Sequence, residues 1–137
     1  MSDKVEVGLI GCGLMGSQHA RNLVEIEGAN LRALADVNLD AAKRLKQEAG
    51  GKYCTPNPQD LFDDEKIDLI LICTHHHLHF PFAIQAAEAG KDIFVEKPLA
   101  LTVKECEQIE SAVKHMGVKL MVGFQARFSP FMKKLKQ

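Results

Sequence analysis

The sequence has 137 residues, of which 46% are hydrophobic and 26% are charged, the balance of one globular domain with its own core. Its 17 Lys and Arg residues stand against 18 Asp and Glu residues, and the resulting net charge of -1 gives no reason to expect a nucleic-acid or membrane surface. No apolar run approaches the ~20 residues that a membrane span requires.

The cysteines and the first residues both favour a cytoplasmic protein. The four cysteines are far apart and form no C-x-x-C pair, so we expect reduced thiols, although spacing alone leaves a disulfide open. They are Cys12, Cys54, Cys73 and Cys106. The first four residues lead directly into an apolar run, and we therefore expect no signal peptide.

Short apolar runs alternate with segments of helical spacing along most of the chain. In chain order they predict a strand over residues 5–10, a helix over 14–27, a strand over 31–37, a helix over 39–49, a short strand over 52–54 and a brief helix around 61–62. There follow a strand over 67–73, a helix over 79–88, a strand over 92–95, a helix from 103 to a stop at 117, and a strand over 118–122. Thr102 and Glu105 can close a capping box on the last helix. This alternation predicts an α/β fold of the Rossmann type, a doubly wound parallel sheet with right-handed crossovers.

A G-x-G-x-x-G motif, Gly11-Cys12-Gly13-Leu14-Met15-Gly16, joins the first predicted strand to the first predicted helix. In a dinucleotide-binding domain, Gly11 permits the tight turn, Gly13 lets the pyrophosphate approach the backbone, and Gly16 lets the helix pack on the strand. The pyrophosphate then lies on free N–H groups at the helix start. The same motif also occurs in plain turns without a ligand and in methyltransferases.

Asp36 follows Gly16 by 20 residues and lies at the end of the second predicted strand, next to Val37. A carboxylate there accepts hydrogen bonds from both hydroxyls of the adenosine ribose and repels a 2′-phosphate, which favours NAD over NADP. Arg44, the nearest downstream cation, falls in the next predicted helix, where we expect it to face water. The alternative is that Asp36 caps that helix.

Further motifs accompany the glycine motif and Asp36. They are Thr74-His75-His76-His77-Leu78-His79, Ala86-Ala87-Glu88-Ala89-Gly90-Lys91, Glu96-Lys97-Pro98, Gly123-Phe124, and Arg127-Phe128 with Pro130. Together they resemble the Gfo/Idh/MocA family of NAD(P)-dependent oxidoreductases, which includes glucose–fructose oxidoreductase and inositol dehydrogenase. The resemblance covers essentially the whole chain, and Glu-Lys-Pro with the upstream Thr and His is far more specific than the glycine motif.

The resemblance implies that Lys97 is catalytic: it lies beside the nicotinamide, hydrogen-bonds the substrate hydroxyl and assists proton transfer as hydride leaves. An ammonium at a strand end can stabilise a developing alkoxide. Glu96 is implied to orient Lys97 or to contact the nicotinamide ribose, and the Lys97–Pro98 peptide bond to be cis. The alternative is an exposed salt bridge at the strand end.

The same resemblance implies that the histidine-rich loop lines the nicotinamide half of the cofactor, with Thr74 and His76 approaching it and His79 beginning the next helix. His75 replaces a proline that many members have. A metal site is the alternative, but zinc sites draw ligands from separated segments, so we expect no metal. Arg127 is implied to lie near the nicotinamide, against the alternative of a linker arginine with a surface partner.

Family members continue into a second α/β domain with a large open sheet, the substrate pocket and most of the oligomer interface. We therefore expect residues 1–122 to form the dinucleotide-binding domain, and residues 123–137 to form a linker and the start of a substrate domain absent from this chain. The implied substrate is a sugar, a cyclitol or a similar alcohol, and the implied assembly is a homo-oligomer. We expect the chain alone to bind NAD without turning over substrate, and to expose apolar surface around Phe124, Phe128 and Phe131.

Three functions stay open at this point: the cofactor half of a dehydrogenase, a stand-alone dinucleotide-binding or sensing module, and methyl transfer, which has no need of Lys97. The predicted cofactor-binding residues are Gly11, Cys12, Gly13, Leu14, Met15, Gly16, Asp36, Val37, Cys73, Thr74, His76, His79, Glu96, Lys97 and Arg127.

Overall fold

The computed structural model describes residues 3–136, except for the side chains of Ala126 and Arg127. One parallel sheet, with strand order β3-β2-β1-β4-β5-β6, organises the chain. Its strands are β1 (Val5–Ile10), β2 (Ala29–Ala35), β3 (Tyr53–Thr55), β4 (Leu69–Ile72), β5 (Asp92–Glu96) and β6 (Leu120–Gly123). The order reverses between β1 and β4, and in such sheets ligands bind beyond the carboxyl ends of the strands at this reversal. The predicted Rossmann fold is confirmed.

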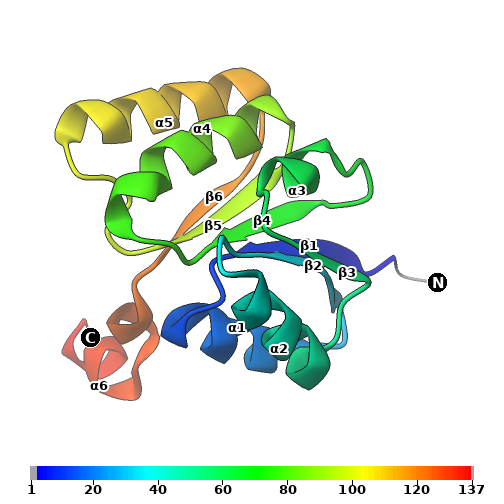
Figure 1. Ribbon diagram of the computed structural model, residues 1–137. Coiled ribbons are helices and arrows are strands. Elements are labelled where there is room, and N and C mark those ends of the chain that lie inside the picture. The colour runs from blue at the N-terminus through cyan, green and yellow to red at the C-terminus, as the bar shows by residue number, and fades with distance from the viewer. Residues whose placement is uncertain (1–2, 137) are drawn as a thin grey trace.

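Helices cover both faces of the sheet (Figure 1). Figure 1 shows α1 (Leu14–Val24) and α2 (Leu39–Ala49) on one face, and α4 (His79–Glu88) and α5 (Val103–Met116) on the other. The short elements are α3 (Gln59–Asp63), η1 (His76–Leu78), η2 (Gln125–Phe128) and α6 (Pro130–Leu135). No helix among the described residues is long and apolar enough to cross a membrane.

Two apolar clusters, one on each face, hold the layers together. On the α4 side, Ala83, Ala86 and Ala87 are fully buried and bring the helix close to the strands. On the α1 and α2 side, Ala20 and Leu45 pack against the sheet in the second cluster. Burial on both faces explains why the strands are apolar at consecutive positions.

The end signals of α5 are confirmed. Thr102 accepts a hydrogen bond at its hydroxyl from the Glu105 N–H (3.1 Å), and the Glu105 carboxylate accepts one from the Thr102 N–H (3.2 Å). Gly117 ends the helix in the left-handed region with φ of 68°. The Lys97–Pro98 peptide bond is cis, as predicted.

Several element ends differ from the predicted ones. Helix α1 ends at Val24 instead of residue 27, because the Glu25 and Ile26 N–H groups bond carbonyls only three residues back. Strand β2 ends at Ala35, although the Asp36 N–H still bonds the Thr55 carbonyl of β3 at 3.2 Å. The predicted strand over 67–73 shortens to Leu69–Ile72, although Asp68 and Cys73 still donate N–H bonds to β1. Strands β2, β3, β5 and β6 differ from the prediction by one or two residues at an end, since the pairing partner decides where a ladder stops.

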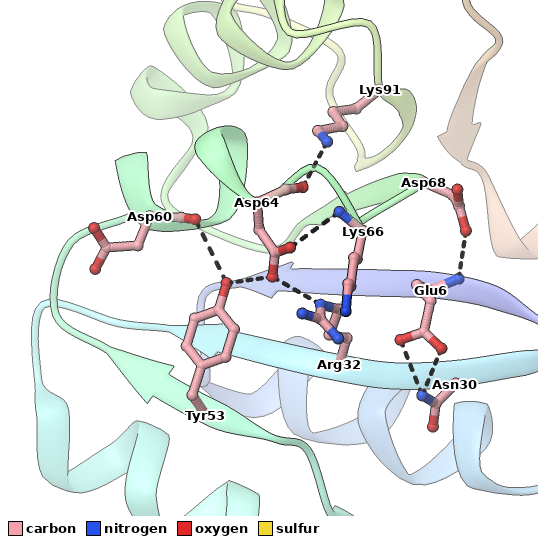
Figure 2. A network of polar contacts seen from close by, with 9 residues as sticks. All are labelled: Glu6, Asn30, Arg32, Tyr53, Asp60, Asp64, Lys66, Asp68 and Lys91. Atoms are coloured by element: carbon pink, nitrogen blue, oxygen red, sulfur yellow. Dashed lines mark hydrogen bonds and ion pairs between the residues drawn. The ribbon is translucent and has the colours of Figure 1, made fainter.

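A polar network ties the amino ends of the strands together (Figure 2). The Asp64 carboxylate accepts hydrogen bonds from Arg32 Nε (2.7 Å), Tyr53 Oη (2.9 Å) and the Lys66 N–H (3.0 Å). Buried Lys91 donates from Nζ to the Asp64 carbonyl at 2.7 Å. Burial opposes the charge of Asp64, but the bonds from Arg32, Lys66 and Tyr53 outweigh it, so the pKa of Asp64 lies below its ordinary value.

The lowered pKa of Asp64 predicts an acid-sensitive contribution to stability. A carboxyl whose folded pKa lies below its unfolded value stabilises the fold above the unfolded pKa, and this stabilisation is lost as pH falls through the folded pKa. Asp64→Asn should therefore lower the melting temperature at neutral pH by several degrees and flatten its decline between about pH 5 and about pH 2. Thermal melts across that range are the measurement.

The control is Glu65→Gln, at an exposed position beside Asp64. It should follow the wild-type curve. Equal slopes for wild type and Asp64→Asn would show that the network does not depend on this ionisation.

Candidate functional site

The glycine motif forms the turn between β1 and α1 at the carboxyl edge of the sheet. Gly11 has φ of 99°, and a Cβ there would collide with the Cys73 carbonyl oxygen of the neighbouring strand end. A Cβ on Gly16 would collide with the Gly11 carbonyl oxygen. These two glycines are therefore required by the backbone itself, because it leaves no room for a side chain.

Gly13 differs from the other two glycines of the motif. A Cβ there would meet no atom within 4 Å, and its φ of -80° suits any residue. Gly13 is the N-cap of α1 and supplies no side-chain cap, and the Ser17 N–H is bonded to the Gly13 carbonyl at 2.9 Å. The N–H groups of the first turn, from Leu14 to Gly16, have no intrahelical acceptor. Open space thus adjoins free donors at the positive end of a helix.

The carboxylate of Asp36 faces the same turn from the end of β2. Its Oδ2 accepts a hydrogen bond from the Cys12 N–H (2.8 Å) and its Oδ1 from the Asn38 N–H (2.8 Å). Asn38, not Asp36, caps α2, since its side chain accepts the Ala41 N–H at 3.3 Å. The helix-cap alternative for Asp36 is therefore wrong. Each carboxylate oxygen keeps a lone pair for a further donor.

Two adjoining cavities follow the carboxyl edge of the sheet. The first, of about 370 Å³, is lined by the glycine turn and by Asp36 and Val37. The second, of about 450 Å³, lies toward β5 and β6. Its lining residues are Met15, Cys73, Thr74, His76, His79, Glu96, Lys97, Phe124 and Gln125. Met15, Cys73 and Thr74 line both cavities, so together they make one cleft long enough for an extended ligand.

Glu96 and Lys97 differ sharply in their surroundings. Lys97 is exposed at the mouth of the second cavity and makes no ion pair among the described residues. Glu96 is 7% exposed, and its Oε1 lies 2.5 Å from Nε2 of His19 in α1. The described residues show no exposed salt bridge at this strand end, and Glu96 pairs instead with His19. His19 was missed from the sequence, and an imidazole on the sheet-facing side of α1 was the available signal.

His79 joins the two loops that flank the second cavity. The side chain is fully buried, with Nδ1 at 2.6 Å from the Pro98 carbonyl oxygen and Nε2 at 3.1 Å from the Thr74 carbonyl oxygen. It begins α4, as the resemblance implied. Each ring nitrogen therefore contacts a backbone carbonyl, and His79 holds the loop after β4 against the Glu-Lys-Pro turn.

The other loop histidines make ring contacts. The His75 and His77 rings stack with centroids 6.1 Å apart, and the His76 ring lies 5.6 Å from the His79 ring. No group of three or more metal-ligand side chains gathers anywhere in the described residues. The Arg127 side chain lies outside the described part of the structure.

Neither Cys12 of the glycine turn nor Cys73 of the cleft is an activated nucleophile. Burial, the nearby Asp36 carboxylate and Cys54 raise the pKa of Cys12 to about 12. Burial and the charges of Glu96 and Cys12 raise the pKa of Cys73 to about 12. All four cysteines are free. Because thiolates are the reactive form, neither thiol is activated, and Cys73 serves as an apolar part of the cleft wall.

The fold and the cleft define a dinucleotide-binding Rossmann domain. Residues 5–124 match the model of the oxidoreductase family with an NAD-binding Rossmann fold, and the chain belongs to this Gfo/Idh/MocA family. It is 35% identical over 133 residues to myo-inositol 2-dehydrogenase of Thermotoga maritima, covering 97% of this chain and 40% of that protein. It is 37% identical over 131 residues to the NAD(+)-dependent scyllo-inositol 2-dehydrogenase of Bacillus subtilis, covering 95% and 38%.

Solved structures give the same result. The scyllo-inositol dehydrogenase of Lactobacillus casei, solved with NAD(H) and scyllo-inositol, superimposes with a TM-score of 0.92 at 27% identity, covering 98% of this chain and 40% of that one. The chain thus spans about 40% of the length of the relatives that it matches.

The residues of the cleft fit NAD. The open space at Gly13 and the free N–H groups of α1 suit a pyrophosphate, and the spare lone pairs of Asp36 suit a ribose diol. The second cavity continues the cleft beyond the glycine turn.

The contrast among the glycines predicts separable effects on binding and folding. Gly13→Ala should keep the wild-type melting temperature, because its Cβ meets no protein atom, yet lower the affinity for NAD by about tenfold or more by occupying the pyrophosphate approach. Gly16→Ala should instead destabilise the fold, because its Cβ collides with backbone. Thermal melts and calorimetric titration with NAD separate the two. Unchanged NAD affinity in Gly13→Ala would contradict this placement of the pyrophosphate.

Proposed function

We propose that this chain is the NAD-binding part of a dehydrogenase that oxidises the CH–OH group of a sugar, a cyclitol or a similar alcohol. The observation that carries the proposal is the position of Lys97, exposed at the mouth of the cavity that continues from the glycine turn and Asp36. The inositol dehydrogenases among the relatives support the substrate class. A dinucleotide-sensing module without catalysis remains the second candidate.

In this proposal Gly11 to Gly16 hold the pyrophosphate, and Asp36 and Val37 border the adenosine ribose. Cys73, Thr74, His76 and His79 line the nicotinamide half, together with Glu96, Lys97 and Arg127. NAD supplies the hydride acceptor. Residues 1–122 would form the cofactor domain, and residues 123–137 a linker toward a substrate domain. Phe124, Phe128 and Phe131 are 49%, 51% and 72% exposed, which supports a face that a further domain or a second copy covers.

Lys97 has the proton-handling role in the proposed reaction. Its amine accepts the proton of the substrate hydroxyl, and the ammonium so formed donates a hydrogen bond to the substrate oxygen while the hydride passes to NAD. The contact between His79 Nδ1 and the Pro98 carbonyl holds the turn that carries Lys97. Positioning of this kind can lower an activation barrier by several kcal/mol, so the rigidity of the turn contributes to the proposed reaction.

We further propose that the protein is a homo-oligomer and that it is cytoplasmic, and the four free thiols support the second of these proposals.

Asp36 predicts a preference for NAD over NADP. A carboxylate at the ribose repels a 2′-phosphate, and Arg44, the nearest downstream cation, is exposed on α2. Asp36→Asn should narrow the difference in affinity between the two dinucleotides by about tenfold, mainly by improving NADP binding. Calorimetric titration of wild type and variant with both ligands is the measurement. The matched control is Asp40→Asn, on α2, and tighter binding of NADP by the wild type would contradict the proposal.

A chimera tests the catalytic role of Lys97. We expect this chain, replacing the matching 40% of the Thermotoga maritima myo-inositol 2-dehydrogenase, to support NADH formation from myo-inositol. Lys97→Met should lower that rate by about a hundredfold or more in a chimera that still binds NAD, because the lysine handles the proton. We expect the 137 residues alone to bind NAD without turnover.

The control is Lys104→Met, an exposed lysine on α5. A chimera that binds NAD and myo-inositol without producing NADH would favour the sensing module. An active Lys97→Met chimera would remove Lys97 from the mechanism.

A further inference from the structure

The carboxylate of Glu96 lies between His19 and Gly123. His19 Nε2 contacts its Oε1 at 2.5 Å, and the His19 ring in turn meets Phe94 edge-on with centroids 5.4 Å apart. On the other side, a Cβ on Gly123 of β6 would come within 3.1 Å of Oε1. A carboxylate that is 7% exposed requires a donor, and His19, with 17% of its side chain exposed, supplies it.

Glu96 is the only carboxylate among the described residues that line the second cavity. The other charged or titratable groups facing it are Lys97, His76, His79 and Cys73. Cys73 stays a neutral thiol, because burial and the Glu96 charge raise its pKa to about 12. Negative charge at this end of the cleft therefore comes from one group, and its position depends on His19.

We propose that Glu96, positioned by His19, makes the site prefer the oxidised dinucleotide over the reduced one. The inference rests on the proposed function, which places a nicotinamide in the cavity with Lys97. The nicotinamide ring carries a positive charge in NAD+ and none in NADH. A fixed carboxylate at the edge of a poorly hydrated cavity attracts the cationic ring and has no such attraction for the neutral ring. Such a preference favours uptake of the cofactor form that an alcohol dehydrogenation consumes.

The alternative is that the pair of Glu96 and His19 only holds α1 against β5. Buried charged pairs are weak evidence of stability in themselves. A purely structural pair would change the melting temperature and would change the affinities for both dinucleotides equally, whereas the proposed role changes the ratio of the two affinities.

The experiment measures dissociation constants of NAD+, NADH and ADP-ribose for the purified 137-residue chain and three variants. Glu96→Gln should lower the ratio of the NADH to the NAD+ dissociation constant by about tenfold, and ADP-ribose affinity should stay constant. His19→Phe should shift the ratio the same way, because the carboxylate loses its donor. His19→Gln retains an N–H donor and should keep the wild-type ratio or raise it.

Glu107→Gln, an exposed glutamate on α5, is the matched control. Both ligands bind the same folded fraction, so the ratio is insensitive to partial unfolding of a variant. A Glu96→Gln ratio within about twofold of wild type would overturn the inference, as would identical ratios for His19→Phe and His19→Gln. Failure of the wild type to bind ADP-ribose would instead contradict NAD binding by the chain.

Discussion

The whole cleft depends on how closely the turn after β1 approaches the end of β4. Gly11 lies against the Cys73 carbonyl, and Gly16 lies against the Gly11 carbonyl. These contacts leave no room for a Cβ, so α1 begins directly at the edge of the sheet, where the strand order reverses between β1 and β4. The free N–H groups of its first turn consequently face the crevice, which is the arrangement that binds a pyrophosphate.

Polar groups hold the loops and strand ends in place at both edges of the sheet. At the amino edge, the Asp64 carboxylate accepts hydrogen bonds from Arg32 and Tyr53, and the Asp64 carbonyl accepts one from Lys91. At the carboxyl edge, His79 binds two carbonyls and holds the loops in place. The two carboxylates that face the cleft are also held by hydrogen bonds, Asp36 by the Cys12 and Asn38 N–H groups and Glu96 by His19. A rigid wall of this kind reduces the ordering that a ligand would otherwise impose.

Local patterns predicted the elements because helix periodicity, capping residues and buried strands leave direct marks in the sequence. The capping box of Thr102 and Glu105 and the stop at Gly117 depend only on neighbours along the chain, and both are confirmed. The ends of strands depend on the partner strand. The predicted strand over 67–73 contracted to Leu69–Ile72 for that reason, and β2 stopped before Asp36.

The parallel sheet, the glycine turn and the family could all be predicted from the sequence, because those features lie in short contiguous motifs. The contacts between side chains could be known only from the packed structure. The Asp36 carboxylate accepts a hydrogen bond from the Cys12 N–H and does not cap α2. Glu96 pairs with His19, which lies 77 residues earlier in the chain. The physical reason is that a side-chain contact depends on the packing of α1 against the sheet, and no local pattern records that distance.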